Sequence, residues 1–284
     1  MGGSAFGRVL HERAKAFHWS GQGSMSIKSF YNGTAQYRLN SGTAIVDSQR
    51  YLLLNHQQPY SITIDSQSEV ESFCVFFSPE LMKRTAFEYV SPEVKALDDP
   101  MFHPVETLEL VDQTYWHDDL VTPALLSLRK GFQTFGSDPL WLDEQLHRLL
   151  RTVMMLHTDT LTRMNKISSR RSSTRQELFR RVSVARDVIM EQFRETLTLE
   201  TLSQWAMLSP NHLIRTYKQA FGVTPHQHVV RLRLDEAGRL LRTSKLSISD
   251  ICAVVGFESL GSFSAVFRRE TGLSPLQYRK LGDF

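Results

Sequence analysis

Cysteine is scarce in this chain of 284 residues, which contains only Cys74 and Cys252. Two cysteines, one in each half, argue against a disulfide framework, and neither has neighbours at a metal-site spacing. The N-terminus lacks the pattern of a signal peptide, and there is no apolar run of about 18 residues that could cross a membrane. We therefore expect a cytoplasmic protein without a membrane segment.

Motifs of the common enzyme classes are also missing. We find no glycine-rich phosphate loop, nucleophile elbow or paired-carboxylate motif. The single His-x-His pair, His226 and His228, falls at the start of a predicted helix, where residues two apart point in different directions. Five other histidines are candidate metal ligands, but no two of them have the i, i+4 spacing that would place them on one face of a helix: His56, His103, His117, His147 and His157. We predict neither an enzyme nor a bound metal or other cofactor.

Positive charge is concentrated in the second half. Residues 1–160 contain 13 Lys and Arg against 19 Asp and Glu, and residues 161–284 contain 20 against 11, so the net charges of −6 and +9 sum to +3. Affinity for nucleic acids comes largely from cations that neutralise phosphates. The second half is therefore a candidate polyanion-binding region, although charge alone leaves open whether the asymmetry has a function.

The first half shows strand-like patterning. Apolar and polar residues alternate in residues 35–40 and 60–65, and turn residues separate such segments between Met25 and Phe77. This pattern predicts several short strands of a small sandwich or barrel. After Ser78-Pro79 the period becomes helical.

A helix is predicted over Pro139–Thr158. Its apolar side chains form one stripe, at Leu142, Leu146, Leu149, Val153 and Leu156. The stripe fits either a subunit contact of a homodimer or burial against the chain's own barrel. Residues 163–175 then hold five basic and no acidic residues without apolar periodicity, so we interpret them as a solvated basic linker between domains 1–162 and 176–284.

The second half contains an internal repeat with an offset of 50. Eight positions from Ser209 to Pro225 recur in type from Ser259 to Pro275. Farther upstream the offset is 49, so the second copy has one extra residue near Glu258, and insertions are typical of turns. Each copy is therefore predicted to be a helix-turn-helix unit, over residues 198–221 and 247–271.

Capping residues mark the helix ends of both copies. The predicted N-caps are Thr198, Ser209 and Ser247, the last in a capping box with Asp250. Pro210 suits a first helical position, and Gly222 and Gly272 can end the second helix of each unit. Residues predicted to form the cores of the units are Leu202, Leu213, Tyr217, Phe263 and Phe267, with Ser203 and Cys252 as small residues at the helix crossings.

A long helix, Pro225–Arg242, is predicted between the units. Its 18 residues span roughly 27 Å at 1.5 Å per residue. Recognition helices that read one face of B-DNA enter major grooves about 34 Å apart, and a rod of this length can hold them near that spacing. Arg231 and Asp235 lie four residues apart on the rod and could form an ion pair.

These segments resemble the DNA-binding domain of the AraC/XylS family of bacterial transcription regulators. The resemblance covers residues 198–281, about a third of the chain, and its clearest segments are Ser209–Arg215, Arg231–Leu241, Ile248–Phe257 and Gly272–Arg279. It implies a sequence-specific regulator of α+β class: a small, cupin-like N-terminal β-barrel with helices, followed by an all-α domain of two helix-turn-helix units. Such a chain inserts two recognition helices into adjacent major grooves of double-stranded promoter DNA.

The resemblance assigns DNA contacts by position. In the first unit Ser209, Asn211, His212 and Arg215 face DNA, with Arg215 able to make a bidentate contact to guanine, and Lys218 is expected to hold phosphate. In the second unit the solvent-side positions are Leu260, Gly261, Ser262, Ser264 and Ala265, and the family often has longer polar or basic side chains at some of these. Arg268 and Arg269 remain for phosphates, so the second helix is expected to position the protein more than to specify the sequence.

For the N-terminal half, the resemblance implies a domain that senses a small-molecule effector and forms a homodimer, and it implies RNA polymerase as a partner in activation. Two other functions stay open on the sequence alone. One is a constitutive DNA-binding adaptor whose N-terminal half only dimerises, and the other is a cupin-type metalloenzyme, which would need several metal ligands on its strands.

Overall fold

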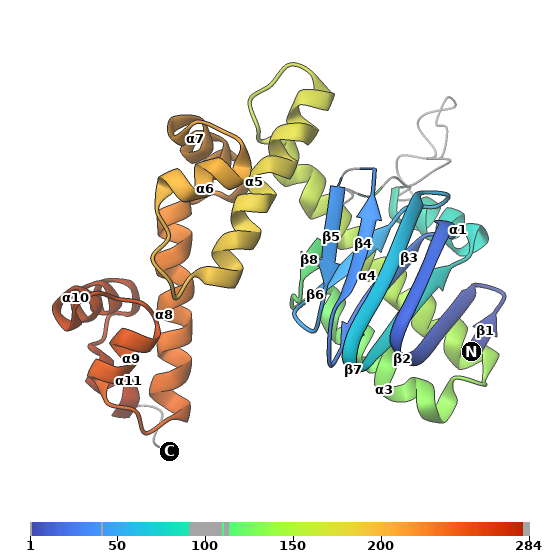
Figure 1. Ribbon diagram of the computed structural model, residues 1–284, viewed down its shortest axis with the longest axis horizontal. Coiled ribbons are helices and arrows are strands. Elements are labelled where there is room, and N and C mark those ends of the chain that lie inside the picture. Colours follow the sequence, from blue (N-terminus) through green and yellow to red (C-terminus); the bar gives the residue numbers. More distant parts are fainter. Residues whose placement is uncertain (1, 41, 91–109, 111–113, 281–284) are drawn as a thin grey trace. The chain divides into compact units, whose positions relative to one another are not determined.

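The computed structural model describes residues 2–40, 42–90, 110 and 114–280. Its internal contacts divide the chain into two compact units, residues 1–160 and 161–284. The first unit is a strongly bent sheet with helices, and the second is helical throughout its described residues (Figure 1). This is the predicted α+β class, with a nearly closed, barrel-like sheet ahead of a helix-turn-helix region.

The described strands of the first unit form one eight-stranded sheet. Their order is β1-β2-β7-β3-β6-β8, with β4 paired to both β5 and β7. The strands are β1 (Gly2–Ser4), β2 (Gly7–Gln22), β3 (Ser26–Tyr31), β4 (Ala35–Leu39), β5 (Gly42–Val46), β6 (Arg50–Leu54), β7 (Pro59–Phe77) and β8 (Thr114–Trp116). The long strand β7 pairs with β4 near its start and with β3 near its end, so it joins the two sides of the bent sheet.

Strand β2 was not among the strands that the sequence predicted. It pairs with β7 along nearly its whole length, with a register shift between Ala14 and Ala16. Of its side chains only Val9 is buried. A strand so exposed does not show the alternation of apolar and polar residues by which half-buried strands are found. Strand β2 also adds His11 and His18 to the histidines of the strand region, beside His56.

The two faces of the sheet have different neighbours. Phe73, Val75 and Phe77 of β7 belong to a core cluster that includes residues of α1 (Pro79–Val90), α3 (Val121–Phe135) and α4 (Pro139–Asn165). Alternate residues of β7, among them Ile62 and Cys74, belong to a second cluster that contains only residues of strands. The helices therefore cover one face, and the other face encloses the interior of the barrel.

The leucine stripe of α4 is core. Leu142, Leu146, Leu149 and Val153 are all fully buried, and they pack in the same cluster as the sheet, with Leu156 partly buried beside them. The alternative of a subunit contact through this stripe is therefore wrong. A helix that crosses the middle of a sheet has to bury a wide apolar face against it, and the stripe supplies that face.

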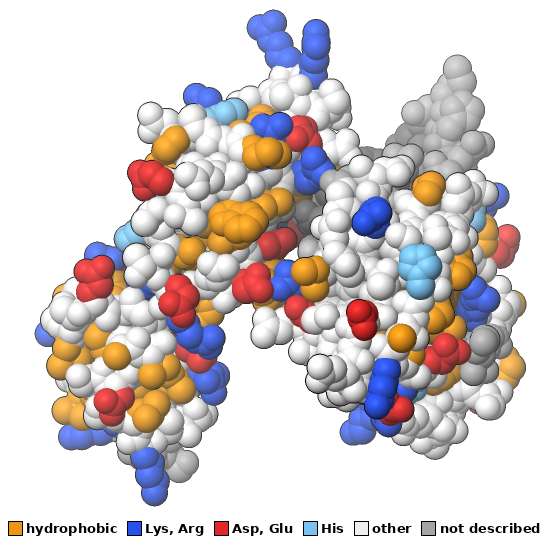
Figure 2. All heavy atoms as spheres, viewed as in Figure 1, with side chains coloured by type: hydrophobic (Ala, Val, Ile, Leu, Met, Phe, Trp, Pro, Cys, Tyr) orange, Lys and Arg blue, Asp and Glu red, His pale blue; other side chains and the backbone are white. Residues whose placement is uncertain are grey.

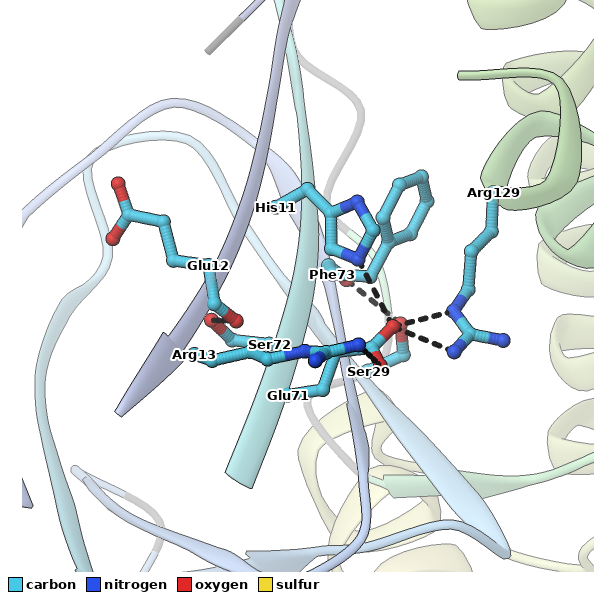
Figure 3. A network of polar contacts seen from close by, with 8 residues as sticks. All are labelled: His11, Glu12, Arg13, Ser29, Glu71, Ser72, Phe73 and Arg129. Carbon is cyan, nitrogen blue, oxygen red and sulfur yellow. Dashed lines mark hydrogen bonds and ion pairs between the residues drawn. The ribbon is translucent and has the colours of Figure 1, made fainter. Parts of the chain in front are cut away.

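A buried carboxylate attaches α3 to the sheet (Figure 3). Oε1 of Glu71, on β7, accepts hydrogen bonds from Nε and Nη2 of Arg129 at 2.9 and 2.6 Å and lies 2.9 Å from Nε2 of His11. The Arg129 guanidinium also lies 3.8 Å from the centre of the Tyr31 ring. Burial raises the pKa of Glu71, but the hydrogen bonds from Arg129 and His11 outweigh it and leave the pKa below its ordinary value. Loss of either partner would leave a poorly compensated buried charge.

The second unit consists of helices joined by short turns. They are α5 (Ser172–Gln192), α6 (Leu199–Ala206), α7 (Pro210–Phe221), α8 (Pro225–Thr243), α9 (Ile248–Val254), α10 (Leu260–Thr271) and α11 (Pro275–Lys280). In Figure 1, α8 runs from the α6–α7 pair to the α9–α10 pair. None of the described helices has the length and apolar character needed to span a membrane.

Both ends of the basic segment 163–175 belong to helices. Helix α4 continues to Asn165 and α5 begins at Ser172, so only residues 166–171 lie outside helices. Ser168 in this short stretch accepts a hydrogen bond from Nε2 of Gln219, on α7, at 2.9 Å. The stretch is therefore shorter than a solvated linker of residues 163–175 and is tied to the first helix-turn-helix unit.

Candidate nucleic-acid interface

The predicted helix boundaries of the repeat are found in the structure. Thr198 caps α6 by accepting a hydrogen bond from the backbone N–H of Thr201. Ser247 and Asp250 form the expected capping box of α9. Gly222 and Gly272 take left-handed conformations, with φ of 78° and 79°, after α7 and α10. Local sequence therefore determines where these helices begin and end.

Ser209 is an exception. It occupies the N-cap position of α7, but its side chain accepts no capping hydrogen bond. Its counterpart Ser259 does accept one, from the N–H of Ser262. Helix α7 begins with Pro210, whose fixed φ suits a first helical residue, so it needs the serine cap less. The prediction of a serine cap there is wrong, and the Ser209 side chain remains exposed.

Buried aromatic and aliphatic side chains hold each recognition helix. Ser203 and Cys252 are buried, as expected of small residues at the helix crossings. The five residues predicted to form the cores are each 0–3% exposed: Leu202, Leu213, Tyr217, Phe263 and Phe267. Cys252 is a free thiol whose Sγ lies 3.7 Å from the carbonyl oxygen of Phe257. These residues position α7 and α10 but do not reach the surface that would face DNA.

The connecting helix is close to its predicted length. Helix α8 has 19 residues and thus a length of roughly 28 Å. Arg231 and Asp235 are both exposed, and the described ion pairs do not include one between them. The rod is therefore not stabilised by that pair.

Two arginines hold the turns of the two units. Arg233 of α8 donates from Nη1 to the carbonyl oxygen of Gly256, at 2.5 Å, and from Nε and Nη2 to the carbonyl oxygens of Phe193 and Glu195, at 2.6 and 2.8 Å. In the first unit, Arg181 donates to the carbonyl oxygen of Met207, at 3.0 Å. Sequence reasoning did not single out either role. The offset of 49 would have paired Met207 with Gly256, but it could not show which side chains reach them.

Helix α7 presents a polar and basic face. Asn211, Arg215 and Lys218 are exposed, at spacings of four and three residues, and therefore share one side of the helix. His212 beside them is half-buried. Among the described residues, Arg215 has no hydrogen-bond or ion-pair partner, so the guanidinium is available to a ligand. An acidic neighbour that would occupy Arg215 is thus not found in the described part of the chain.

Helix α10 presents a face of small residues followed by arginines. Leu260, Gly261, Ser262 and Ala265 are exposed, while Ser264 is half-buried. The Ser262 hydroxyl donates to the carbonyl oxygen of Ser259, at 2.9 Å. Arg268 and Arg269 are exposed in the last turn, where Arg269 Nη2 lies 2.9 Å from a carboxylate oxygen of Glu270. Figure 2 shows Lys and Arg side chains projecting from the outer surface of the α9–α11 region.

The predicted histidine pair of α8 is divided between two environments. His226 is exposed, whereas Nδ1 of His228 lies 2.6 Å from the hydroxyl of Tyr217. Of the other histidines, His117 and His147 contact Thr122 and Glu88, and His103 lies outside the described residues. Within the described ranges, no three His, Cys, Asp or Glu side chains come together in a way that could hold a metal ion.

Comparisons with known proteins assign this architecture to a family. A helix-turn-helix domain model matches residues 202–281. The probable transcriptional regulator LumQ of Photobacterium leiognathi is 30% identical over 192 residues, which are 66% of this chain and 71% of LumQ. The chain belongs to the AraC/XylS family of transcriptional regulators.

Other similar proteins match about a third of the chain. The transcriptional activator RhaS of Escherichia coli O139:H28 is 38% identical over 93 residues, which are 33% of this chain and 34% of RhaS. This chain therefore covers about a third of the length of that relative. Among solved structures, the C-terminal domain of AraT from Geobacillus stearothermophilus is 33% identical over 36% of this chain and 84% of its own length, with a TM-score of 0.35.

Proposed function

We propose that this AraC/XylS regulator binds promoter DNA by inserting α7 and α10 into adjacent major grooves. The observation that carries the proposal is the exposed face of Asn211, Arg215 and Lys218 on α7, which has no partner within the described ranges and is repeated in position by the face of α10 that ends in Arg268. The rod α8, at roughly 28 Å, suits helices that must reach successive grooves.

The individual roles follow from side-chain chemistry. We assign base contacts to Asn211, His212 and Arg215, because amides and guanidinium groups make bidentate hydrogen bonds to adenine and guanine. Lys218, Arg268 and Arg269 are assigned to phosphates. Ser209 is assigned to the DNA backbone at the first groove. The residues of α10 assigned to the second groove have no long polar side chain: Leu260, Gly261, Ser262, Ser264 and Ala265.

We further propose that the protein is a cytoplasmic homodimer without a catalytic activity of its own, and that it activates transcription through RNA polymerase in response to an effector. RhaS is named an activator, which supports the direction of regulation. The domain roles are an effector-sensing and dimerising region in residues 1–162 and a DNA-binding region in residues 176–284.

Selection of binding sites from random double-stranded DNA with the full chain tests the proposal. We expect a strongly specified half-site for α7 and a weakly specified one for α10, whose centres lie about 10 base pairs apart, one helical turn. Affinity should fall steeply with salt, as phosphate contacts require. A selection that returns no enriched motif, or a footprint on the selected DNA that covers the groove of one half-site only, would overturn the proposed mode of binding.

A further inference from the structure

The strand-only face of the barrel encloses a cavity of about 260 Å³. Its wall comes from β2, β3, β4 and β7 and is mainly aromatic and aliphatic, with Phe30, Tyr37, Tyr60, Ile62, Ile64 and Phe76 among the lining residues. Phe17 and Trp19 of β2 also line it and are 45% and 37% exposed. Large apolar side chains are thus in contact with solvent at this cavity, as in pockets that receive a ligand.

One cation is buried in this apolar wall. Lys28 of β3 is 2% exposed. Its Nζ lies 3.8 Å from the centre of the Phe76 ring and 5.3 Å from that of Tyr60. Arg8 lines the same cavity, with its guanidinium carbon 4.7 Å from the Phe76 ring centre. One end of the cavity therefore carries two cations around a single aromatic ring.

The described residues contain no counter-charge for Lys28. Glu12 is the one carboxylate among the lining residues, but it is exposed, and the described ion pairs do not include Lys28. The other titratable groups around the amine are neutral near pH 7, because burial raises the pKa of Cys74 and Tyr37 and raises that of Tyr60 to about 12. The ammonium group therefore faces neutral groups and Arg8.

Such a lysine costs the fold stability. Transfer of an unpaired ammonium group from water to an apolar site is unfavourable, and a cation–π contact offsets only part of that cost. In this cavity burial lowers the pKa of Lys28 to about 8. An apolar side chain such as Met would fill the position with a smaller loss of folding stability. A buried, poorly compensated cation in a cavity is instead typical of a binding site.

We propose that this cavity is the effector site and binds a small organic carboxylate, whose anionic group pairs with Lys28 while its apolar or aromatic body packs on the ring-lined wall. The proposal rests on the effector-regulated function proposed above. Ligand pockets commonly have volumes of about 300–1,000 Å³. A cavity of about 260 Å³ therefore suits a small acid, such as an aryl or medium-chain aliphatic acid.

Matched acids and amides test the charge requirement on the full-length protein. The probes are phenylacetate against phenylacetamide and octanoate against octanamide, measured by titration calorimetry and by Trp19 fluorescence, with Trp19→Phe to assign the signal. We expect at least one acid to bind 10-fold or more tightly than its amide. Carboxylate binding should raise the pKa of Lys28 from about 8, so at pH 8 the complex should take up to about half a proton, seen as a buffer-dependent heat.

Variants then assign the effect to Lys28. Lys28→Met should abolish the preference for the acid and raise the melting temperature, whereas Lys15→Met, at an exposed lysine of β2, should change neither. Equal binding of acids and amides, no binding of either acid at millimolar concentration, or an acid preference that survives Lys28→Met would overturn the proposal. If Lys28→Met does not fold, the wild-type protein tests the proposal by itself. The proposal then requires that an acid binds more tightly than its amide and that its binding takes up protons at pH 8.

DNA retardation with and without the acid separates the two proposals. An acid that binds through Lys28 but leaves DNA affinity and transcription unchanged would contradict the effector-regulated function and favour a constitutive adaptor, while the site itself stands. Conversely, DNA binding to two half-sites without any acid binding would leave the DNA proposal intact and remove the carboxylate site.

Discussion

The two helix-turn-helix units have the same scaffold but different surfaces. Their recognition helices have 12 residues each, begin after a serine N-cap and end at a left-handed glycine. The exposed or half-buried pairs, in order along α7 and α10, are Asn211 and Gly261, His212 and Ser262, Arg215 and Ala265, and Lys218 and Arg268. The scaffold is therefore the same in both units, while side chains that can form hydrogen bonds with base edges are exposed or half-buried mainly on the first.

The turns differ in a similar manner. Met207 in the first turn has φ of 50° and is 68% exposed, whereas its counterpart Gly256 has φ of 90°. A Cβ at Gly256 would overlap the carbonyl oxygen of Arg194, two residues after the last residue of α5. The second turn is thus packed more tightly on its surroundings than the first turn is. Arg233 donates hydrogen bonds both to this second turn, at Gly256, and to Phe193 after α5.

The largest effect is expected from Arg233→Met. Three hydrogen bonds that join the end of α5 to the second turn would be lost. The two recognition helices would no longer be held in one geometry, so affinity for DNA with both half-sites should fall by about 100-fold, the scale of a lost second attachment. Affinity for DNA with the first half-site alone should stay unchanged in a mobility-shift titration.

Arg231→Met is the matched control, because Arg231 is an exposed arginine two residues away on the same helix. It should weaken binding to both DNAs by less than 10-fold. An equal loss on one and two half-sites for Arg233→Met would mean that Arg233 does not act by coupling the two units.

Next in size is Arg215→Ala. Loss of a bidentate contact to guanine should cost about 1 to 3 kcal/mol and relax the preference at one or two base pairs of the first half-site. Arg268→Ala should instead weaken binding to all sequences alike and reduce the salt slope by about one, as expected of a phosphate contact. Binding selections with randomised half-sites measure both. If Arg215→Ala retains the wild-type base preference, the assignment of base readout to α7 is wrong.

Acid should destabilise the first unit more than the second. Burial, with Arg186 nearby, lowers the pKa of His228 from 6.5 to about 4, and this histidine contacts Tyr217. At the equivalent place, the second unit has a ring contact of Phe267 with Tyr278, at 5.3 Å, which does not titrate in this range. Because the unfolded chain binds the proton more readily, the stability contributed by neutral His228 is complete above pH 6.5 and is lost as the pH falls toward 4.

The expected loss in the first unit between pH 7 and pH 5 is about 2 kcal/mol. Hydrogen exchange read by mass spectrometry, corrected for intrinsic rates, should show it in peptides of α7 but not of α10. His228→Gln should remove the difference, and His226→Gln, at an exposed histidine of the same helix, should not. Equal loss of protection in both helices would contradict this account.

The smallest effect is a gain in the second unit. Ala265 is exposed on α10 at the position that corresponds to Arg215. Ala265→Arg should therefore create a preference for guanine in the second half-site and tighten binding there by about 10-fold, about 1.4 kcal/mol. Ala253→Arg adds the same charge at an exposed position of α9 and should give no base preference. The absence of a new preference with Ala265→Arg would show that α10 does not approach the base edges.

The C-terminal half was largely predictable because its signals are local. Proline and serine at helix starts, glycine at helix ends and the repeat itself determine the units without knowledge of distant contacts. The N-terminal half was less predictable from the sequence. Strand β2 exposes most of its side chains, and its place in the sheet depends on pairing with β7, whose paired residues lie 37 (Gln22 with Pro59) to 70 (Gly7 with Phe77) positions away in sequence.

Several functional features depend on such distant contacts. The period of two places Lys28 on the same strand face as Phe30, but only the fold brings Phe76 and Tyr60 around its amine. Likewise, the apolar stripe of α4 fits a partner helix or a sheet equally well, since periodicity shows that a face is buried and not what buries it.

By itself, then, the sequence determined the two helix-turn-helix units, their caps except that of Ser209, their cores and the family, because residues a few positions apart encode helices and turns. The tertiary structure decided which surface of each element is covered, that Arg233 holds the second turn against α5, and that Lys28 lies in an apolar cavity. Burial and hydrogen bonding between segments far apart in the chain depend on how the whole chain packs, and no local pattern contains that information.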